Sequence, residues 1–245
     1  MRAILFFFVV TLFACQSPKK ELTAQEVIEN TMRVSGSDKI GNAIISFMFR
    51  NKSYLATRNK GLFSLTRSFD SIVDVLTNKE FQRFIDGNPI ELSDSLATIY
   101  SNSVNSVHYF SVLPFGLNDK AVHKKRLPSV NIQGKEYYKI EITFSENGGG
   151  KDHEDVFIYW IGKEDFMMDY LAYSFYTNGG GKRFRVVKNQ QVVNGIRFVD
   201  VDNYKPIDSK IELINIDKAF ENKQLEKLSE IVLEDLQVEI YKVNY

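Results

Sequence analysis

Two neighbouring runs, DVFIYWI at residues 155–161 and DYLAYSFYT at residues 169–177, decide the fold. Successive side chains of a strand point to opposite faces. In the first run both faces are apolar: Val156, Ile158 and Trp160 on one, Phe157, Tyr159 and Ile161 on the other. The second run repeats this pattern. A strand that is apolar on both faces must be covered on both. We expect a helix or a core against one face, and the helix at 96–113, a partner or an apolar ligand against the other.

The same period of two extends outward from these runs. Short runs rich in β-branched and aromatic residues occupy 42–49, 52–58, 62–68, 72–77, 80–85, 136–144, 182–188, 196–205 and 236–243. Turn residues such as Asn59-Lys60-Gly61 and Asp86-Gly87 separate them, which predicts antiparallel hairpins. Residues 114–128 and 189–195 read as connections. Ten or eleven strands with three helices predict a mainly antiparallel α+β domain.

Three segments have helical spacing. Thr23 and Glu26 form a capping box for the first helix, which Gly36 ends. The second helix covers 96–113, with Ser93 or Asp94 as its cap and Pro114 at its end. Asp217 is expected to cap a third, short helix that runs through Phe220, Leu225 and Leu228.

The sequence NGGGK occurs twice, at residues 147–151 and 178–182. A phosphate-binding loop would lead into a helix, whereas a strand pattern follows each copy, so both predict tight hairpin turns. One turn separates the two loops, which places them at the same end of a meander. His153, Glu154, Lys182 and Arg183 are therefore expected in one neighbourhood, as the rim of a pocket or as a solvated loop cluster.

The first residues, MRAILFFFVVTLFAC, have the length of a secretory signal and are too short to span a membrane. The single cysteine, Cys15, ends this run like the lipidated cysteine of a bacterial lipoprotein. We expect a signal peptide at 1–14, a polar tether at 15–22 and one domain at 23–245. An ordinary secreted protein with a stray cysteine is the alternative. Lys19 and Lys20 favour the periplasmic face of the outer membrane.

Charge and composition limit the classes of partner and reaction that fit this sequence. The 31 basic residues balance 31 acidic ones, which argues against a nucleic-acid partner. His108, His123 and His153 form no metal-binding spacing, and we expect no metal and no cofactor. No GxSxG motif is present, which removes one class of hydrolase. An enzyme is therefore the less favoured class, and the sequence leaves the oligomeric state open.

Arginines recur within the strand-like segments, at positions 58, 67, 83, 183, 185 and 197. On a solvent-exposed face of the sheet, such arginines would indicate no particular function. Within a concavity, they would suit an anionic head group while aromatic side chains hold an apolar chain. The candidate ligand-binding residues are Arg67, Arg83, His108, Tyr109, Trp160, Tyr173, Phe175, Arg183 and Arg185.

The sequence resembles a family of uncharacterised lipoproteins of Bacteroidota. The matching stretches include LTAQEVI, SLATIYSNSVNSVHYFSVLPFGLND, GGGKDHEDVFIYWI and YLAYSFYTNGGGKRFR. The resemblance implies a fold similar to the LolA/LolB lipoprotein carriers: a curved half-barrel sheet with an N-terminal helix and a helix covering its concave face. Relatives are often labelled deoxyribose-phosphate aldolase. That enzyme is a parallel (β/α)₈ barrel, which the hairpins here exclude.

Three functions remain open. The leading hypothesis is a membrane-anchored periplasmic lipoprotein that binds an acyl or other amphipathic ligand in its concave sheet. The second is an envelope enzyme with a site at the loop end, 147–154 and 178–185. The third is an interaction module without a pocket.

Overall fold

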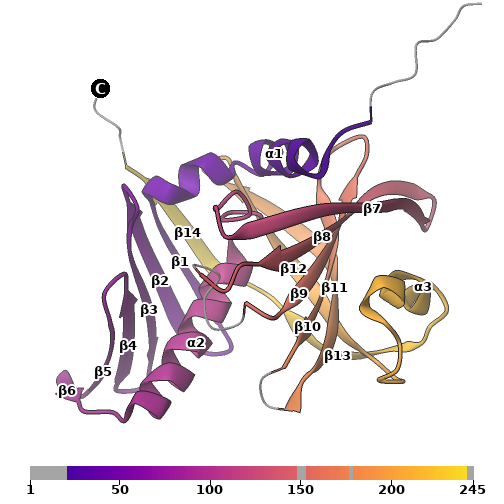
Figure 1. Ribbon diagram of the computed structural model, residues 1–245. Coiled ribbons are helices and arrows are strands. Elements are labelled where there is room, and N and C mark those ends of the chain that lie inside the picture. Colours follow the sequence, from indigo (N-terminus) through magenta and orange to yellow (C-terminus); the bar gives the residue numbers. More distant parts are fainter. Residues whose placement is uncertain (1–20, 148–152, 177–178, 242–245) are drawn as a thin grey trace, which may run out of the picture.

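The computed structural model describes residues 21–147, 153–176 and 179–241 (Figure 1). The expected signal peptide, Cys15 and most of the tether lie outside these ranges, as do residues 148–151 of the first NGGGK sequence and residue 178 of the second. The described chain is mainly antiparallel β with few helices, so the predicted fold class is confirmed. The strands divide into two seven-stranded sheets instead of one.

The first sheet has the strand order β14-β1-β2-β3-β4-β5-β6. Its members are β1 (Ala43–Phe49), β2 (Lys52–Asn59), β3 (Leu62–Phe69), β4 (Ile72–Thr77), β5 (Phe81–Ile85), β6 (Asn88–Ile90) and β14 (Glu234–Ile240). Tight turns connect β1 to β6 in sequence, and the last strand of the chain pairs with β1. The predicted hairpins of this half are confirmed.

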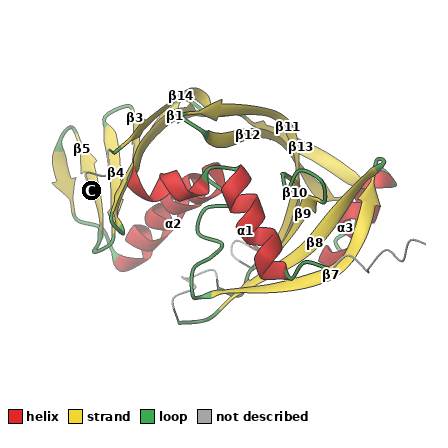
Figure 2. Ribbon diagram, turned by 90° about the horizontal axis from the view of Figure 1, so that it is seen from above, coloured by secondary structure: helices red, strands yellow, loops and turns green. Residues whose placement is uncertain are grey.

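The second sheet has the order β13-β12-β11-β10-β9-β8-β7. Its members are β7 (Val122–Ile132), β8 (Lys135–Phe144), β9 (Val156–Gly162), β10 (Met168–Phe175), β11 (Gly181–Val193), β12 (Ile196–Pro206) and β13 (Leu225–Ile231). Figure 2 shows the two sheets as one open arc around α1 (Ala24–Val34) and α2 (Asp94–Ser111). We call the face toward these helices the inner face.

Two segments that the sequence predicts as connections contain strand residues instead. The region 114–128 was expected as a loop, but β7 begins at Val122. It is an edge strand, where a bulge after Leu127 accommodates Pro128. The segment 189–195 was expected as a connection, but β11 runs to Val193 and turns at Asn194-Gly195, both with positive φ. Strand β7 is one of three that the sequence did not predict; with β6 and β13 it brings the described strands to fourteen, against the ten or eleven expected.

The third helix also differs from the prediction. Helix α3 (Ile216–Glu221) follows η3 (Leu213–Asn215) and ends before Leu225, which begins β13. Asp217 lies within α3 and does not cap it. Asp217 is 2% exposed, and its carboxylate binds Lys139, a partner far away in sequence that no local pattern could reveal.

The ends of α1 and α2 follow the predicted caps. The Thr23 hydroxyl accepts a hydrogen bond from the Glu26 amide at 3.2 Å, and the Glu26 carboxylate accepts one from the Thr23 amide at 2.7 Å. Ser93 caps α2. The 3-10 helix η1 (Ser37–Asn42) leads from α1 into β1.

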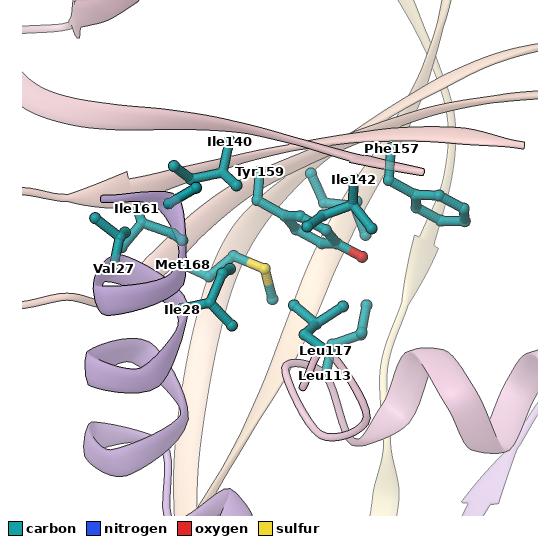
Figure 3. Packing of buried hydrophobic residues seen from close by; sticks show 12 residues of the cluster. Val27, Ile28, Leu113, Leu117, Ile140, Ile142, Phe157, Tyr159, Ile161 and Met168 are labelled. Atoms are coloured by element: carbon teal, nitrogen blue, oxygen red, sulfur yellow. The ribbon is translucent and has the colours of Figure 1, made fainter. Parts of the chain in front are cut away.

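Both faces of β9 are buried, as the alternating pattern predicts. On the inner face, Tyr159 and Ile161 pack with Ile140 under Val27 and Ile28 of α1, as Figure 3 shows. On the outer face, Ile158 and Trp160 pack with Phe184 under Ile216 and Phe220 of the α3 segment. Helices therefore cover this sheet from both sides.

Candidate functional site

A cavity of about 810 Å³ lies between the inner faces of the two sheets, beside α2. Most of its lining residues are apolar, and six of the aromatic ones are Phe49, Tyr109, Phe110, Phe157, Tyr173 and Phe175. Four arginines (Arg50, Arg58, Arg183 and Arg185) and three aspartates (Asp119, Asp155 and Asp169) also reach the lining. Ligand sites commonly have this combination of a concave apolar wall and few charged groups.

Helix α2 has one face that packs on the first sheet and one that lines the cavity. Val104 and His108 are buried, and Val104 packs on Ala56 and Leu65 of the first sheet. The opposite face carries Asn102, Asn105, Ser106, Tyr109 and Phe110, all of which line the cavity. These positions follow the three- and four-residue spacing of a helix face. The helix is therefore anchored on one sheet and presents its other side to the cavity.

The wall formed by the second sheet follows from strand register. Phe157, Tyr173 and Arg183 lie in one row across β9, β10 and β11. Leu171, Arg185 and Asn203 form the next row, across β10, β11 and β12. Residues opposite one another in neighbouring strands share a face, so both rows point inward.

Aromatic rings hold Arg185 in this wall. Its guanidinium lies 3.9 Å from the ring centroid of Phe110 and donates a hydrogen bond to the Tyr173 hydroxyl at 3.3 Å. Burial lowers the pKa of Arg185. Burial also raises the pKa of Tyr109 to about 12, so this hydroxyl stays protonated. The wall thus combines aromatic surface with a cation held by ring contacts.

Five of the predicted ligand-binding residues line the cavity: Tyr109, Tyr173, Phe175, Arg183 and Arg185. Four others, Arg67, Arg83, His108 and Trp160, are not among its lining residues. The structure gives each of these four a different environment.

Arg67 and Arg83 share one carboxylate. Asp74, which is 0% exposed, accepts hydrogen bonds from Arg67 at 2.6 and 3.0 Å and from Arg83 at 2.7 and 3.0 Å. Burial alone would raise the pKa of Asp74, but the hydrogen bonds and charges of the two arginines outweigh it and lower the pKa. Arg67 also donates to Ser103, and Arg83 stacks on Tyr100, so this cluster ties α2 to the first sheet.

His108 is buried between α2 and the first sheet. One ring nitrogen lies 3.0 Å from the Thr66 carbonyl, and the ring packs edge-on against Phe47 and Tyr54. Burial, with a smaller contribution from the charge of Arg58, lowers the pKa of His108 to about 4. The imidazole is therefore neutral near pH 7 and donates to Thr66.

Trp160 lies on the outer face, away from the cavity. Its indole N–H donates to Asp217 at 3.1 Å, and the same carboxylate oxygen accepts a hydrogen bond from Lys139 at 2.8 Å. All three residues are buried, with at most 4% of their surface exposed. Trp160 therefore reports on the docking of α3 and not on the cavity.

The described strand ends that flank the two glycine loops lie at the same end of the second sheet, as the meander predicts. Val156, Ser174 and Lys182 form one row across β9, β10 and β11 at this end. Lys182 donates to the Ser209 carbonyl, whereas its neighbour Arg183 points to the cavity. His153 and Glu154 precede β9 at this end and are not among the lining residues.

Arg58 lines the cavity, although the sequence indicates it only as one of the recurring arginines and not as a ligand-binding candidate. Its direct neighbour across the β2–β3 hairpin is Phe63, whereas Arg67 and Arg83 both lie opposite Asp74. The lengths of the tight turns set the register of these hairpins, and the register determines which residues face each other. A register argument could therefore have separated Arg58 from the other two arginines.

Two searches of the described residues gave no result. Within 21–147, 153–176 and 179–241, no group of three or more His, Cys, Asp or Glu could hold a metal ion. No helix in these ranges is both long and apolar enough to cross a membrane.

The two open antiparallel sheets, with a helix and a cavity between them, define an incomplete β-barrel of LolA-like architecture. The chain itself belongs to a family of unknown function, DUF6503, whose model matches residues 2–234. The resemblance to a family without established function is confirmed, while its expected occurrence in Bacteroidota stays a prediction. No curated protein matches the sequence.

Two solved structures support this description of the fold. A LolA superfamily protein from Nitrosomonas europaea superposes with a TM-score of 0.50 at 11% identity, over 91% of this chain and 96% of that one. A DUF1329 family protein from Desulfovibrio piger gives a TM-score of 0.51 at 11% identity, over 88% and 92%. The predicted LolA-like half-barrel is therefore confirmed.

Proposed function

We propose that this protein is an envelope lipoprotein that binds a hydrophobic or amphipathic ligand in the cavity beside α2. The observation that carries the proposal is the cavity itself, with a volume of about 810 Å³ and a mainly apolar, aromatic lining. Sites for small ligands typically measure about 300–1,000 Å³ and are lined in this way. A concavity filled by its own side chains would have favoured the pocketless interaction module.

The composition of the lining indicates the ligand class. The ring centroids of Phe110, Phe157 and Tyr173 lie 5.2–6.1 Å from one another, and the three rings offer a continuous apolar surface. Removing an apolar chain from water onto such a surface is favourable by about 25 cal/mol per Å². An acyl chain is the simplest ligand whose binding would be stabilised by this burial of apolar surface.

We further propose that the signal peptide at 1–14 is removed, that Cys15 carries the lipid, and that a single domain at 23–245 follows the tether. The expected location is the periplasmic face of the outer membrane. Cells grown with labelled palmitate should incorporate label into the wild-type protein and not into Cys15→Ser. Equal labelling of both would refute the anchor and leave the cavity proposal untouched.

Mass spectrometry of bound molecules tests the cavity proposal. Protein isolated from its native envelope should carry an amphiphile that a protein-free control lacks. Ser106→Trp places a large ring on the cavity face of α2, and Ser95→Trp places the same ring on its exposed first turn. We expect the amphiphile to be lost from Ser106→Trp and retained by Ser95→Trp. An equal yield from both variants would contradict binding in this cavity.

A further inference from the structure

Four arginines of the described chain are only 6–8% exposed: Arg58, Arg67, Arg83 and Arg197. Arg67 and Arg83 bind the Asp74 carboxylate. Arg197 donates to the Gln190 side chain and the Met168 carbonyl, and lies 3.9 Å from a carboxylate oxygen of Asp169. A buried guanidinium without such partners is costly, because it has lost its hydration.

Arg58 differs from the other three. It is 8% exposed and lines the cavity, yet its Nη1 is buried without a hydrogen-bond partner among the described residues. Its guanidinium lies 5.6 Å from the ring centroid of Phe115, a weak contact for a full charge. Its cross-strand neighbour is Phe63, whose side chain supplies no acceptor.

The charge of Arg58 persists despite this burial. Burial lowers the pKa of Arg58 to about 10, and no carboxylate offsets the shift. The group therefore stays protonated near pH 7. Neighbouring His108 is neutral at that pH, so it neither adds to the charge of Arg58 nor offsets it. Of the three lining aspartates, Asp169 is already bound by Lys135 and Tyr137.

We propose that Arg58 binds the anionic head group of the amphiphile, a carboxylate or a phosphate, while the aromatic lining contacts its chain. This assignment rests on the proposed function and narrows it to anionic amphiphiles. A planar guanidinium can donate two parallel hydrogen bonds to either group. Arg185 also lines the cavity, but its contacts with Phe110 and Tyr173 already occupy part of its surface.

Titration calorimetry with three probes of equal chain length tests the assignment. Decanoate and decyl phosphate carry the two head groups, and decanol carries none; all are used below the concentrations at which they aggregate. Wild-type protein should bind all three and prefer both anions to decanol. Arg58→Gln should lower the affinity for the preferred anion by about 10- to 100-fold and leave decanol binding unchanged. Arg33→Gln, on the exposed side of α1, is the control and should bind like wild type.

The outcomes separate the two proposals. If decanol binds but the anions gain nothing over it, or if Arg58→Gln binds every probe like wild type, the role of Arg58 is refuted and the apolar site stands. If no probe binds, both proposals fail. A preference for one anion identifies the head group as a carboxylate or a phosphate. Thermal denaturation supplies a second readout: Arg58→Gln should be at least as stable as wild type without ligand. A lower melting temperature would mean that Arg58 serves the fold.

Discussion

Asp74→Asn should be among the most destabilising single substitutions in this protein. The Asp74 side chain is 0% exposed and accepts four hydrogen bonds from Arg67 and Arg83, the shortest at 2.6 Å. Asparagine keeps the shape but leaves two buried cations without a countercharge. Removing one partner of a buried ion pair typically costs about 3–5 kcal/mol. Because Ser103 and Tyr100 of α2 contact the same arginines, the cavity wall should loosen too.

Urea denaturation at pH 7 measures this loss. With a slope of about 1–3 kcal/mol per M, the midpoint should fall by more than about 1 M. Asp70→Asn is the matched control, because Asp70 lies exposed in the β3–β4 turn at a positive φ that asparagine tolerates. Since the pKa of Asp74 is lowered, its contribution should be complete above the ordinary pKa of about 3.9 and disappear at lower pH. A midpoint for Asp74→Asn equal to that of Asp70→Asn would refute the reasoning.

Three further predictions concern other parts of the fold. Asp217→Asn should lower the free energy of unfolding by about 3 kcal/mol and change the emission of the single tryptophan, Trp160; unchanged emission would mean that the buried contact is not made. Thr23→Ala should cost about 1 kcal/mol in thermal denaturation through loss of the α1 cap, and no loss would contradict the capping box. The pKa of His108 falls from 6.5 to about 4 on folding, so the unfolded chain binds an extra proton between these values. Stability should therefore drop by about 3 kcal/mol as the pH falls from 6.5 to 4, and His108→Gln should remove that slope.

Local patterns predicted most of the fold. Periods of two and the capping box at Thr23 gave the hairpins and the first helix, because these signals depend on neighbours in sequence. Strand β7 was missed, since charged residues and Pro128 hide the pattern of an edge strand. The α3 segment was misread because Asp217 resembles a cap until Lys139, from a distant strand, is brought beside it.

The candidate site was predicted less completely. Strand alternation groups Tyr173 with Phe175 and Arg183 with Arg185 on shared faces, but it does not show which face is the inner one, because both faces of these strands carry apolar residues. Trp160 could not be placed, because the covering of the outer face by Ile216 and Phe220 has no periodic signal. Strand register could have separated Arg58 from Arg67 and Arg83, but its unpaired charge follows only from knowing which side chains surround it in three dimensions.

A crystal structure with a bromine-terminated decanoate tests the central claim most directly. Anomalous scattering locates the bromine, and the electron density locates the head group. We expect the bromine among the aromatic residues of the cavity, near Phe110 and Phe157, with the carboxylate at Arg58. A bound ligand found only outside the arc of the two sheets, with the cavity closed by its own side chains, would contradict the account.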